Sequence, residues 1–287
     1  MRVPLPVVRA VVLAGSRPLG PPVPVAVQRT WLEASARLGR TPAGTRVEPV
    51  VLGGRPAERV TASGAAAGTP VLWLHGGAFW TCSPRTHRVL AAHLAAATGG
   101  PVLVPDYRLA PEHPYPAPVD DALAALAELS ADGPVVLGGD SAGGAIALLL
   151  AQALRDEGAD LPQGLALVSP VVDFTQALSA AYPGTDVVLR EGWVREGTRA
   201  FLAGADPAAT SPLQRGLHDL PPVLVQTSSD ERLGPEGARL VEGLRAVGTD
   251  VSAEVLPGLW HDVHLQADLV PEAAAAVQRI GNWVRQR

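Results

Sequence analysis

The sequence predicts a single α/β domain built around a largely parallel sheet. Short apolar runs alternate with segments of helical periodicity through most of the chain, and this order is typical of parallel strands joined by right-handed helical crossovers. A glycine-rich turn within residues 134–150 joins one apolar run to an Ala/Leu-rich helical segment. The chain has 287 residues, which is enough for one large domain with an inserted subdomain.

Composition and charge exclude several classes of protein. Hydrophobic residues make up 47% of the chain and charged residues 18%, as in a globular protein and unlike a disordered one. The formal net charge is −5 and no basic block is present, which argues against nucleic acid or an anionic membrane as a partner. No run of 18 apolar residues exists, so we expect no membrane span. Arg9 and two prolines interrupt the apolar N-terminus, so we expect no signal peptide and a cytoplasmic location.

The single cysteine and the scattered histidines favour neither a disulfide framework nor a metal site. Cys82 has Trp80 and Thr81 before it, which favours a small buried residue over a nucleophile. Several histidines lack the spacing of metal ligands, so we expect no metal; they are His75, His87, His93, His113 and His218.

The N-terminal third predicts one helix and three strands. Residues 25–38 place Val27, Trp31, Ala34 and Leu38 at helical spacing, which predicts a helix that either covers the site or packs on the body. Residues 45–62 alternate as two strands with a Gly53-Gly54 turn between them. Residues 71–74 form a continuous apolar run, as expected of a strand that is buried on both faces.

The rest of the chain continues the alternation, with one interruption. Helices are expected at 85–98, 118–130, 235–247 and 271–285, and strands at 101–105, 135–137, 165–169, 223–226 and 251–256. Between residues 170 and 220 there is no strand signal, only a helical segment at 187–202. We interpret residues 1–40 and 170–220 as a helical cap over the C-terminal ends of the strands, within one domain of residues 1–287.

Ser141 is the candidate nucleophile. Residues 139–143 fit G-x-S-x-G, the turn that exposes a serine hydroxyl at the top of a sheet between a strand and a helix. A turn this sharp leaves no room for Cβ atoms where the two backbones approach each other, which explains the glycines. An ordinary glycine-rich strand-to-helix turn would look similar, so the assignment depends on partners elsewhere in the chain.

Two later strands supply candidate partners for this serine. In hydrolases of this type an acid and then a histidine follow the serine, each on a loop after a strand. Asp230 ends one strand and His261 follows the next. Glu231 is the alternative acid, but Asp230 is preferred because it comes first off the strand. His264 is the alternative base, and the Pro257-Gly258 turn favours His261.

A glycine-rich loop supplies a candidate oxyanion hole. Residues 75–78 leave a strand at the same sheet edge, and their small side chains let backbone N–H groups approach a carbonyl oxygen. Ala142, directly after the serine, adds a further N–H, because an amide in the first turn of a helix lacks a partner within the helix.

Several motifs together resemble those of the bacterial hormone-sensitive-lipase-like (family IV) esterases, which have the α/β-hydrolase fold. They are HGGAF at 75–79, DYRLAPEHPYPAP at 106–118, GDSAGG at 139–144, SDERL at 229–233 and PGLWHD at 257–262. The resemblance covers about residue 45 to the C-terminus, and it implies a mostly parallel sheet of about eight strands. It also implies that Ser141, His261 and Asp230 are the triad and that Gly77, Ala78 and Ala142 form the oxyanion hole. Ala78 stands where the family usually has a third glycine.

The function implied is serine carboxylic-ester hydrolysis of small to medium, short-chain acyl esters, with no cofactor. A lactone hydrolase of the monoterpene-lactone type would use the same triad, and a non-catalytic small-molecule receptor would be expected to have lost a triad member. The substrate is a small molecule, and the sequence also allows a homodimer. Large aromatic residues are the candidates for the substrate pocket: Trp31, Phe79, Trp80, Trp193, Phe201 and Trp260.

Overall fold

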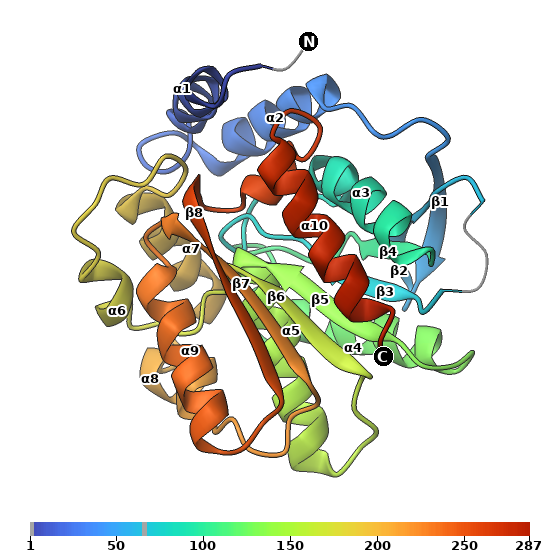
Figure 1. The fold of residues 1–287 in the computed structure, drawn as a ribbon. Helices are drawn as coiled ribbons and strands as arrows, with labels where there is room; N and C mark the ends of the chain where they lie inside the picture. The colour runs from blue at the N-terminus through green and yellow to red at the C-terminus, as the bar shows by residue number, and fades with distance from the viewer. Residues whose placement is uncertain (1–2, 65–67) are drawn as a thin grey trace.

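A computed structural model describes residues 3–64 and 68–287, which form an eight-stranded sheet between two layers of helices (Figure 1). The strand order is β1-β2-β4-β3-β5-β6-β7-β8. The strands are β1 (Arg46–Leu52), β2 (Arg55–Thr61), β3 (Val71–Leu74), β4 (Val102–Pro105), β5 (Val136–Asp140), β6 (Gly164–Val168), β7 (Val223–Asp230) and β8 (Val251–Trp260). β2 pairs antiparallel with β1 and β4, and the other recorded pairings are parallel. The predicted fold, a mostly parallel sheet of about eight strands, is confirmed.

The central strands are buried on both faces, so alternate side chains enter two different cores. In β3, Val71 and Trp73 pack with helices α3 (Arg88–Thr98) and α10 (Pro271–Val284) on one face. Leu72 and Leu74 pack on the other face with α4 (Ala117–Ser130), α5 (Ser141–Glu157) and α9 (Gly234–Ala246). These short strands therefore read as continuous apolar runs in the sequence.

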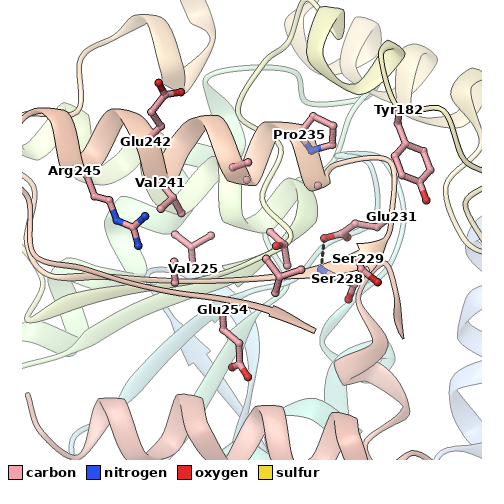
Figure 2. A pocket seen from close by; sticks show the side chains of 16 residues that line it. Tyr182, Val225, Ser228, Ser229, Glu231, Pro235, Val241, Glu242, Arg245 and Glu254 are labelled. Atoms are coloured by element: carbon pink, nitrogen blue, oxygen red, sulfur yellow. Dashed lines mark hydrogen bonds between the residues drawn. The ribbon is translucent and has the colours of Figure 1, made fainter. Parts of the chain in front are cut away.

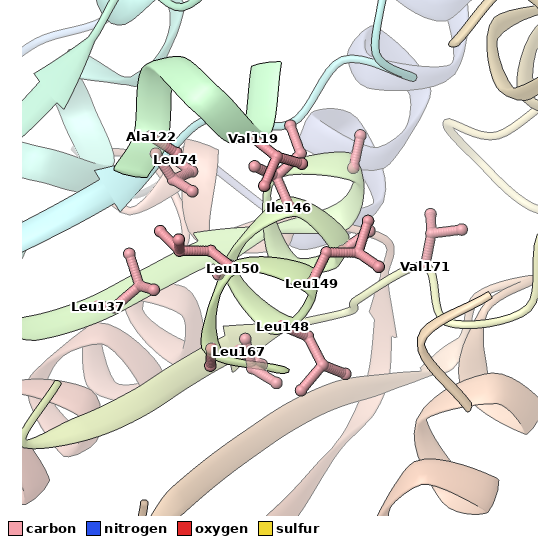
Figure 3. Close-up of a cluster of buried hydrophobic side chains, with 14 of the residues drawn as sticks. Leu74, Val119, Ala122, Leu137, Ile146, Leu148, Leu149, Leu150, Leu167 and Val171 are labelled. Carbon is pink, nitrogen blue, oxygen red and sulfur yellow. The ribbon is translucent and has the colours of Figure 1, made fainter. Parts of the chain in front are cut away.

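Helix α5 lies at the centre of the second core, directly after β5 (Figure 3). Its Ala/Leu-rich sequence has high helix propensity, and it ends at Gly158, which adopts the left-handed conformation common just past a helix end. Its first turn needs glycine, because a Cβ on Gly143 would overlap the carbonyl group of Leu74. A Cβ on Gly139 would lie 2.6 Å from the carbonyl carbon of Gly143.

The N-terminal region contains one helix that the sequence analysis missed. Helix α1 (Leu5–Ser16) has Pro4 as its N-cap and a second proline in its first turn, where proline is compatible with a helix. The predicted helix at 25–38 is confirmed as α2 (Val25–Ser35) followed by the short 3₁₀ helix η1 (Ala36–Leu38). Residues 1 and 2 of the predicted cap segment 1–40 lie outside the described residues.

Between β6 and β7 the chain forms α6 (Ala177–Ala180), α7 (Glu191–Leu202), α8 (Pro207–Thr210) and a 3₁₀ turn, η3 (Pro212–Gln214). The helix predicted at 187–202 begins four residues late, because the Asp186 carboxylate accepts hydrogen bonds from the backbone N–H groups of Val188 and Leu189 and holds a turn there. Two further 3₁₀ helices are η2 (Pro84–His87) and η4 (Val263–Gln266). Within residues 3–64 and 68–287, no helix combines the length and apolar character needed to cross a membrane.

Candidate active site

Ser141 lies at the sharp turn between β5 and α5, and its backbone is left-handed with φ 51°. A positive φ is costly for a residue with a side chain and persists where the surrounding structure enforces it. The close approach of Gly143 to β3 provides that constraint. The Ser141 hydroxyl lies 3.0 Å from Nε2 of His261, within hydrogen-bond distance.

His261 follows β8 and connects the serine to a buried carboxylate. Its Nδ1 atom lies 2.7 Å from Oε2 of Glu231. If Nδ1 carries the proton and donates it to Glu231, Nε2 is left as an acceptor for the Ser141 hydroxyl. Glu231, His261 and Ser141 thus form a continuous chain of hydrogen bonds.

Glu231 is fully buried, and polar partners satisfy its carboxylate. Oε1 accepts hydrogen bonds from the Ser169 hydroxyl at 3.0 Å and from the backbone N–H of Ser228 at 2.7 Å. A buried carboxylate is tolerated when its oxygens are hydrogen-bonded and a cation can form beside it. This environment fixes the carboxylate against His261.

The prediction that Asp230 partners the histidine is wrong in this structure, and the alternative, Glu231, takes that position. The Asp230 carboxylate is 37% exposed and pairs with Arg9 of α1 at 2.9 Å. Hydrogen bonds from Arg9 and then Ser229 lower its pKa. The β7–β8 register shifts between Ser228 and Asp230, and such an irregularity re-aims the side chains that follow it. Asp230 consequently faces outward and Glu231 inward.

The alternatives to Ser141 and His261, which are Cys82 and His264, take no part in this hydrogen-bond chain. His264 uses its Nε2 atom for the side chain of Gln226 at 2.9 Å, and burial lowers its pKa to about 4. Burial raises the pKa of the Cys82 thiol to about 12, so the thiol stays protonated and unreactive.

Asp262 is a second buried acid at the histidine, and the sequence analysis did not identify it. Its Oδ2 atom lies 2.9 Å from Nε2 of His261, on the side of the ring that also faces Ser141. Nε2 accepts its hydrogen bond from the Ser141 hydroxyl, so the contact with Asp262 is chiefly one of charge. Oδ1 of Asp262 is buried and has no hydrogen-bond partner among the described residues.

The two acids change the titration of the histidine. Burial lowers the pKa of His261, but the charges and hydrogen bonds of Asp262 and Glu231 outweigh it and raise that pKa well above 6.5. Burial raises the pKa of Asp262 to about 7, against the opposing charge of His261. Both neighbouring carboxylates therefore favour the protonated form of His261.

The predicted oxyanion loop has an unusual backbone over three consecutive residues. Gly77, Ala78 and Phe79 have φ of 120°, 52° and 67°. The carbonyl of Gly77 accepts hydrogen bonds from the backbone N–H and the hydroxyl of Thr81, which fixes the loop. In the described part of the chain, the N–H groups of Gly77 and Ala78 donate to no recorded partner, as expected of donors reserved for a ligand oxygen.

Asp140 connects this loop to the serine, and the sequence analysis assigned it no role. Its carboxylate accepts hydrogen bonds from the Gly76 N–H at 2.9 Å and the Trp73 indole at 2.7 Å, and it pairs with His87 at 3.0 Å. Burial raises the pKa of Asp140, but the charge of His87 and the hydrogen bonds from His87 and Trp73 together outweigh burial and lower that pKa. Asp140, which directly precedes Ser141, thus fixes Gly76 of the loop beside the serine.

Helix α7 packs directly against the loop. A Cβ on Gly197 would meet the carbonyl oxygen of Ala78, and would lie 3.0 Å from the Ala78 methyl group. Because Gly197 has no side chain, the methyl group of Ala78 fits beside α7.

The structure brings only some of the predicted pocket residues together. Phe79 and Phe201 stack with ring centroids 4.2 Å apart, and Phe174 packs edge-on against both. The indole N–H of Trp31 donates to the carbonyl of Gly15, and the ring is partly exposed on the outer surface. Four of the six candidates lie in the core with at most 5% of their surface exposed: Phe79, Trp193, Phe201 and Trp260.

A surface groove of about 700 Å³ lies between β7, β8, α9 and Tyr182 (Figure 2). Glu231 lines one end of it, where its carboxylate accepts the hydrogen bond from the Ser228 N–H. Ser141 and His261 are not among its lining residues. The groove therefore borders Glu231 but does not lead to the Ser141 hydroxyl.

Comparison with known proteins agrees with this geometry. Residues 71–265, more than half of the chain, match a family described by the alpha/beta hydrolase fold. LipR of Mycobacterium tuberculosis, whose name gives it as a candidate acetyl-hydrolase, is 35% identical over 96% of this chain and 92% of its own. Esterase LipU of the same organism is 34% identical over 85% of this chain and 89% of its own. Both names refer to the hydrolysis of esters or acetyl groups, and neither refers to lactones.

Solved structures give the same assignment. The crystal structure of an esterase from the bacterial hormone-sensitive lipase family superimposes with a TM-score of 0.91 at 33% sequence identity, and covers 100% of this chain and 99% of that one. With the motifs, the fold and the site geometry all in agreement, the chain belongs to the α/β-hydrolase fold family and, within it, to the bacterial hormone-sensitive-lipase esterases.

Proposed function

We propose that this family member hydrolyses small carboxylic esters with Ser141 as nucleophile, His261 as general base and Glu231 as the acid that orients the histidine. The observation that carries the proposal is the buried hydrogen-bond chain from Glu231 through His261 to Ser141. A serine hydroxyl is a weak nucleophile until a base removes its proton, and the base needs a fixed tautomer. This hydrogen-bond chain supplies both.

In the first step His261 Nε2 accepts the Ser141 hydroxyl proton while Oγ forms a bond to the ester carbonyl carbon. The carbonyl oxygen becomes an oxyanion, which the N–H groups of Gly77, Ala78 and Ala142 stabilise. The carbon–oxygen bond to the alcohol then breaks, and the alcohol leaves with the proton from Nε2. Glu231 stabilises the imidazolium during this step and keeps its own charge.

In the second step water restores the enzyme. His261 Nε2 accepts a proton from water as the water oxygen attacks the acyl carbon bound to Ser141. The same three N–H groups hold the second oxyanion. When the bond to Ser141 breaks, Oγ recovers the proton and the carboxylic acid departs. Every proton and electron pair is accounted for by the protein, the ester and water, so no cofactor is needed.

Short-chain acyl esters are the proposed substrates. The name of LipR refers to acetyl groups, and the methyl group of Ala78 takes up space beside the oxyanion loop where the family usually has glycine. The tight contact of that loop with Gly197 also favours a small acyl group.

We further propose that residues 1–40 and 170–220 form a cap that must move to admit the substrate. In this structure Ser141 is 5% exposed and His261 is 2% exposed, too little for an ester carbonyl to reach the hydroxyl. The N-terminal part bonds to the second part, because the Ser16 hydroxyl donates to the carbonyl of Val187. The two parts would therefore move together.

The test is hydrolysis of p-nitrophenyl acetate and butyrate by the wild type and Ser141→Ala. We expect the variant to lose measurable turnover and to keep the circular dichroism spectrum and melting temperature of the wild type. A fluorophosphonate probe should label the wild type and leave the variant unlabelled. Retained turnover or labelling in Ser141→Ala would refute the assignment of the nucleophile.

A further inference from the structure

Helices α1 and α2 turn apolar side chains toward solvent. Val11 on α1 is 65% exposed, Val27 on α2 is 52% exposed and Leu38 at the end of η1 is 83% exposed. The polar Gln28 is fully buried instead, where its side chain bonds to the backbone of Gly20 and Val23. This is the reverse of an ordinary surface helix, whose apolar stripe faces the core.

The exposed apolar residues form stripes along the two helices. Val7 and Val11 are one helical turn apart on α1. On α2 and η1, the predicted helical spacing of Val27, Trp31 and Leu38 is present, but the stripe faces outward. The Trp31 indole donates to the Gly15 carbonyl at 2.8 Å, so the stripe of α2 meets the C-terminal end of α1. Figure 1 shows both helices at the outer edge of the molecule. We call the surface formed by Val7, Val11, Val27, Trp31 and Leu38 the apolar cap face.

Positive charge borders this face. Residues 3–40 contain five arginines and a single acid, Glu33, although the whole chain has a net charge of −5. Arg9 and Arg29 pair with Asp230 and Glu112. The other three are exposed and their side chains have no carboxylate partner among the described residues, although the backbone N–H of Arg40 donates to Asp268; they are Arg17, Arg37 and Arg40. Charges separated by more than a Debye length of about 10 Å are largely screened. The local excess of arginines over acids therefore matters more for a surface that contacts this face than the negative net charge of the whole chain.

The opposite sides of these helices contact loops of the candidate active site. Arg9 of α1 bonds to Asp230, the neighbour of Glu231. Arg29 of α2 donates to the carbonyl of Trp80, two residues after Ala78. A helix with its side chains is about 10–12 Å across, so a surface that contacts the apolar cap face lies one helix diameter from those loops.

We propose that the apolar cap face docks on an anionic lipid surface. Its valine, leucine and tryptophan side chains would enter the boundary between headgroups and acyl chains, while Arg17, Arg37 and Arg40 pair with lipid phosphates. Exposed apolar residues beside unpaired cations are the features by which a surface helix binds such a boundary. Docking does not require the ester hydrolysis proposed above, and it adds a binding site about one helix diameter from the loops of the candidate active site.

The test is vesicle flotation of the full chain. One set of vesicles contains phosphatidylcholine and phosphatidylglycerol in equal amounts, and the other contains phosphatidylcholine alone. We expect binding to the anionic vesicles that weakens at high salt, and much weaker binding to the neutral ones. Arg37→Gln should weaken binding about fivefold, as expected for one arginine near an anionic surface.

Two substitutions test the apolar contribution, with one matched control. Val11→Glu and Leu38→Glu should each weaken binding at least about tenfold. Each change removes an apolar side chain that would enter the lipid and adds a negative charge that anionic headgroups repel. Val51→Glu is the control, since Val51 is 70% exposed on β1, outside the proposed face. It should bind as the wild type does. All three positions are exposed, so folding should be unaffected, which melting temperatures would verify.

Three outcomes would overturn the proposal. The first is that the full chain fails to float with anionic vesicles. The second is that Val11→Glu and Leu38→Glu bind as tightly as Val51→Glu. The third is that sedimentation shows an oligomer which both glutamate variants dissociate, without vesicle binding, so that a second copy covers this face. Ser141→Ala should bind vesicles like the wild type, which separates a failure of docking from a failure of the proposed catalysis.

Discussion

Oε2 of Glu231 lies 2.7 Å from Nδ1 of His261, whereas the carboxylate of its neighbour Asp230 is turned away to Arg9. Two consecutive acids thus occupy opposite environments. Glu231 is fully buried and fully hydrogen-bonded, and Asp230 is a partly exposed half of a surface ion pair. Surface pairs contribute little to stability, about 0–1 kcal/mol.

The paired substitutions Glu231→Gln and Asp230→Asn separate these two acids. Glu231→Gln keeps the shape of the side chain but can offer an N–H to Nδ1, which favours the wrong histidine tautomer. We expect kcat for p-nitrophenyl butyrate to fall by about 10⁴, as for the equivalent change in a serine protease triad. Asp230→Asn should keep kcat near the wild-type value. A large loss in Asp230→Asn with little loss in Glu231→Gln would restore Asp230 as the triad acid.

The fold could be predicted from the sequence because its signals are local. The continuous apolar run at residues 71–74 reflects burial on both faces, and the Gly53-Gly54 turn produced the expected β1–β2 hairpin. The choice between Asp230 and Glu231 is different, because it depends on the irregular register of β7 on β8. That irregularity is set by tertiary pairing, and no residue in the segment signals it.

Helix α1 and the roles of Asp140 and Asp262 could not be predicted from the sequence, for related reasons. Pro4 and Pro6 suggested an irregular opening, but they lie at the start of the helix, where no backbone N–H is needed. Asp262 directly follows the predicted histidine, His261. Asp140 occupies the first variable position of the G-x-S-x-G motif. Only the folded structure shows that Asp262 contacts Nε2 of His261 and that Asp140 holds Gly76.

Asp262→Asn should extend activity to lower pH. His261 must be neutral to accept the serine proton, so kcat/KM rises with pH through the pKa of this histidine. Asp262 and Glu231 raise that pKa well above 6.5 against the effect of burial. Removing the charge of Asp262 lowers the pKa of His261, so the acidic limb of the kcat/KM profile should move to lower pH.

The control for this prediction is Asp219→Asn, which changes an exposed acid that pairs with His218 away from the site. Asp262→Gly is a second variant, because Asp262 has φ 51° and glycine adopts that conformation freely. Both Asp262 variants should shift the limb in the same direction, and Asp219→Asn should leave it in place. An unchanged limb in both Asp262 variants would show that this carboxylate does not act on the base.

Gly197→Ala on α7 should displace the proposed oxyanion loop and lower kcat. The added Cβ would meet the carbonyl of Ala78 and displace the loop that carries two of the three proposed oxyanion donors. Loss of one such donor typically lowers kcat by about 10²–10³, and we expect an effect approaching that range with little change in KM. The matched control is Gly192→Ala on the same helix, where the nearest atom would be 3.7 Å away. If Gly197→Ala lowers only the melting temperature and keeps kcat, then α7 does not position the loop.

Asp140→Ala should destabilise the whole domain as well as the loop. The change leaves the indole N–H of Trp73, the N–H of Gly76 and the ring of His87 without their buried acceptor. Breaking a buried charge pair in this way costs about 3–5 kcal/mol in the free energy of unfolding, which urea titration would measure. Glu191→Ala is the control, because it removes an exposed pair with Arg195 and should cost about 0.3–0.5 kcal/mol.

The pH dependence of that stability distinguishes a charged pair from a neutral hydrogen bond. The pKa of Asp140 is lowered in the folded state, so its contribution is present above its ordinary value of 3.8 and is lost as pH falls through the folded value. The pKa of His87 is raised by Asp140 against burial, so its contribution is present below 6.5 and is lost as pH rises through the folded value. The difference in unfolding free energy between wild type and Asp140→Ala should therefore be largest between these limits. A difference that stays constant from acidic to alkaline pH would mean that Asp140 and His87 do not form a charged pair.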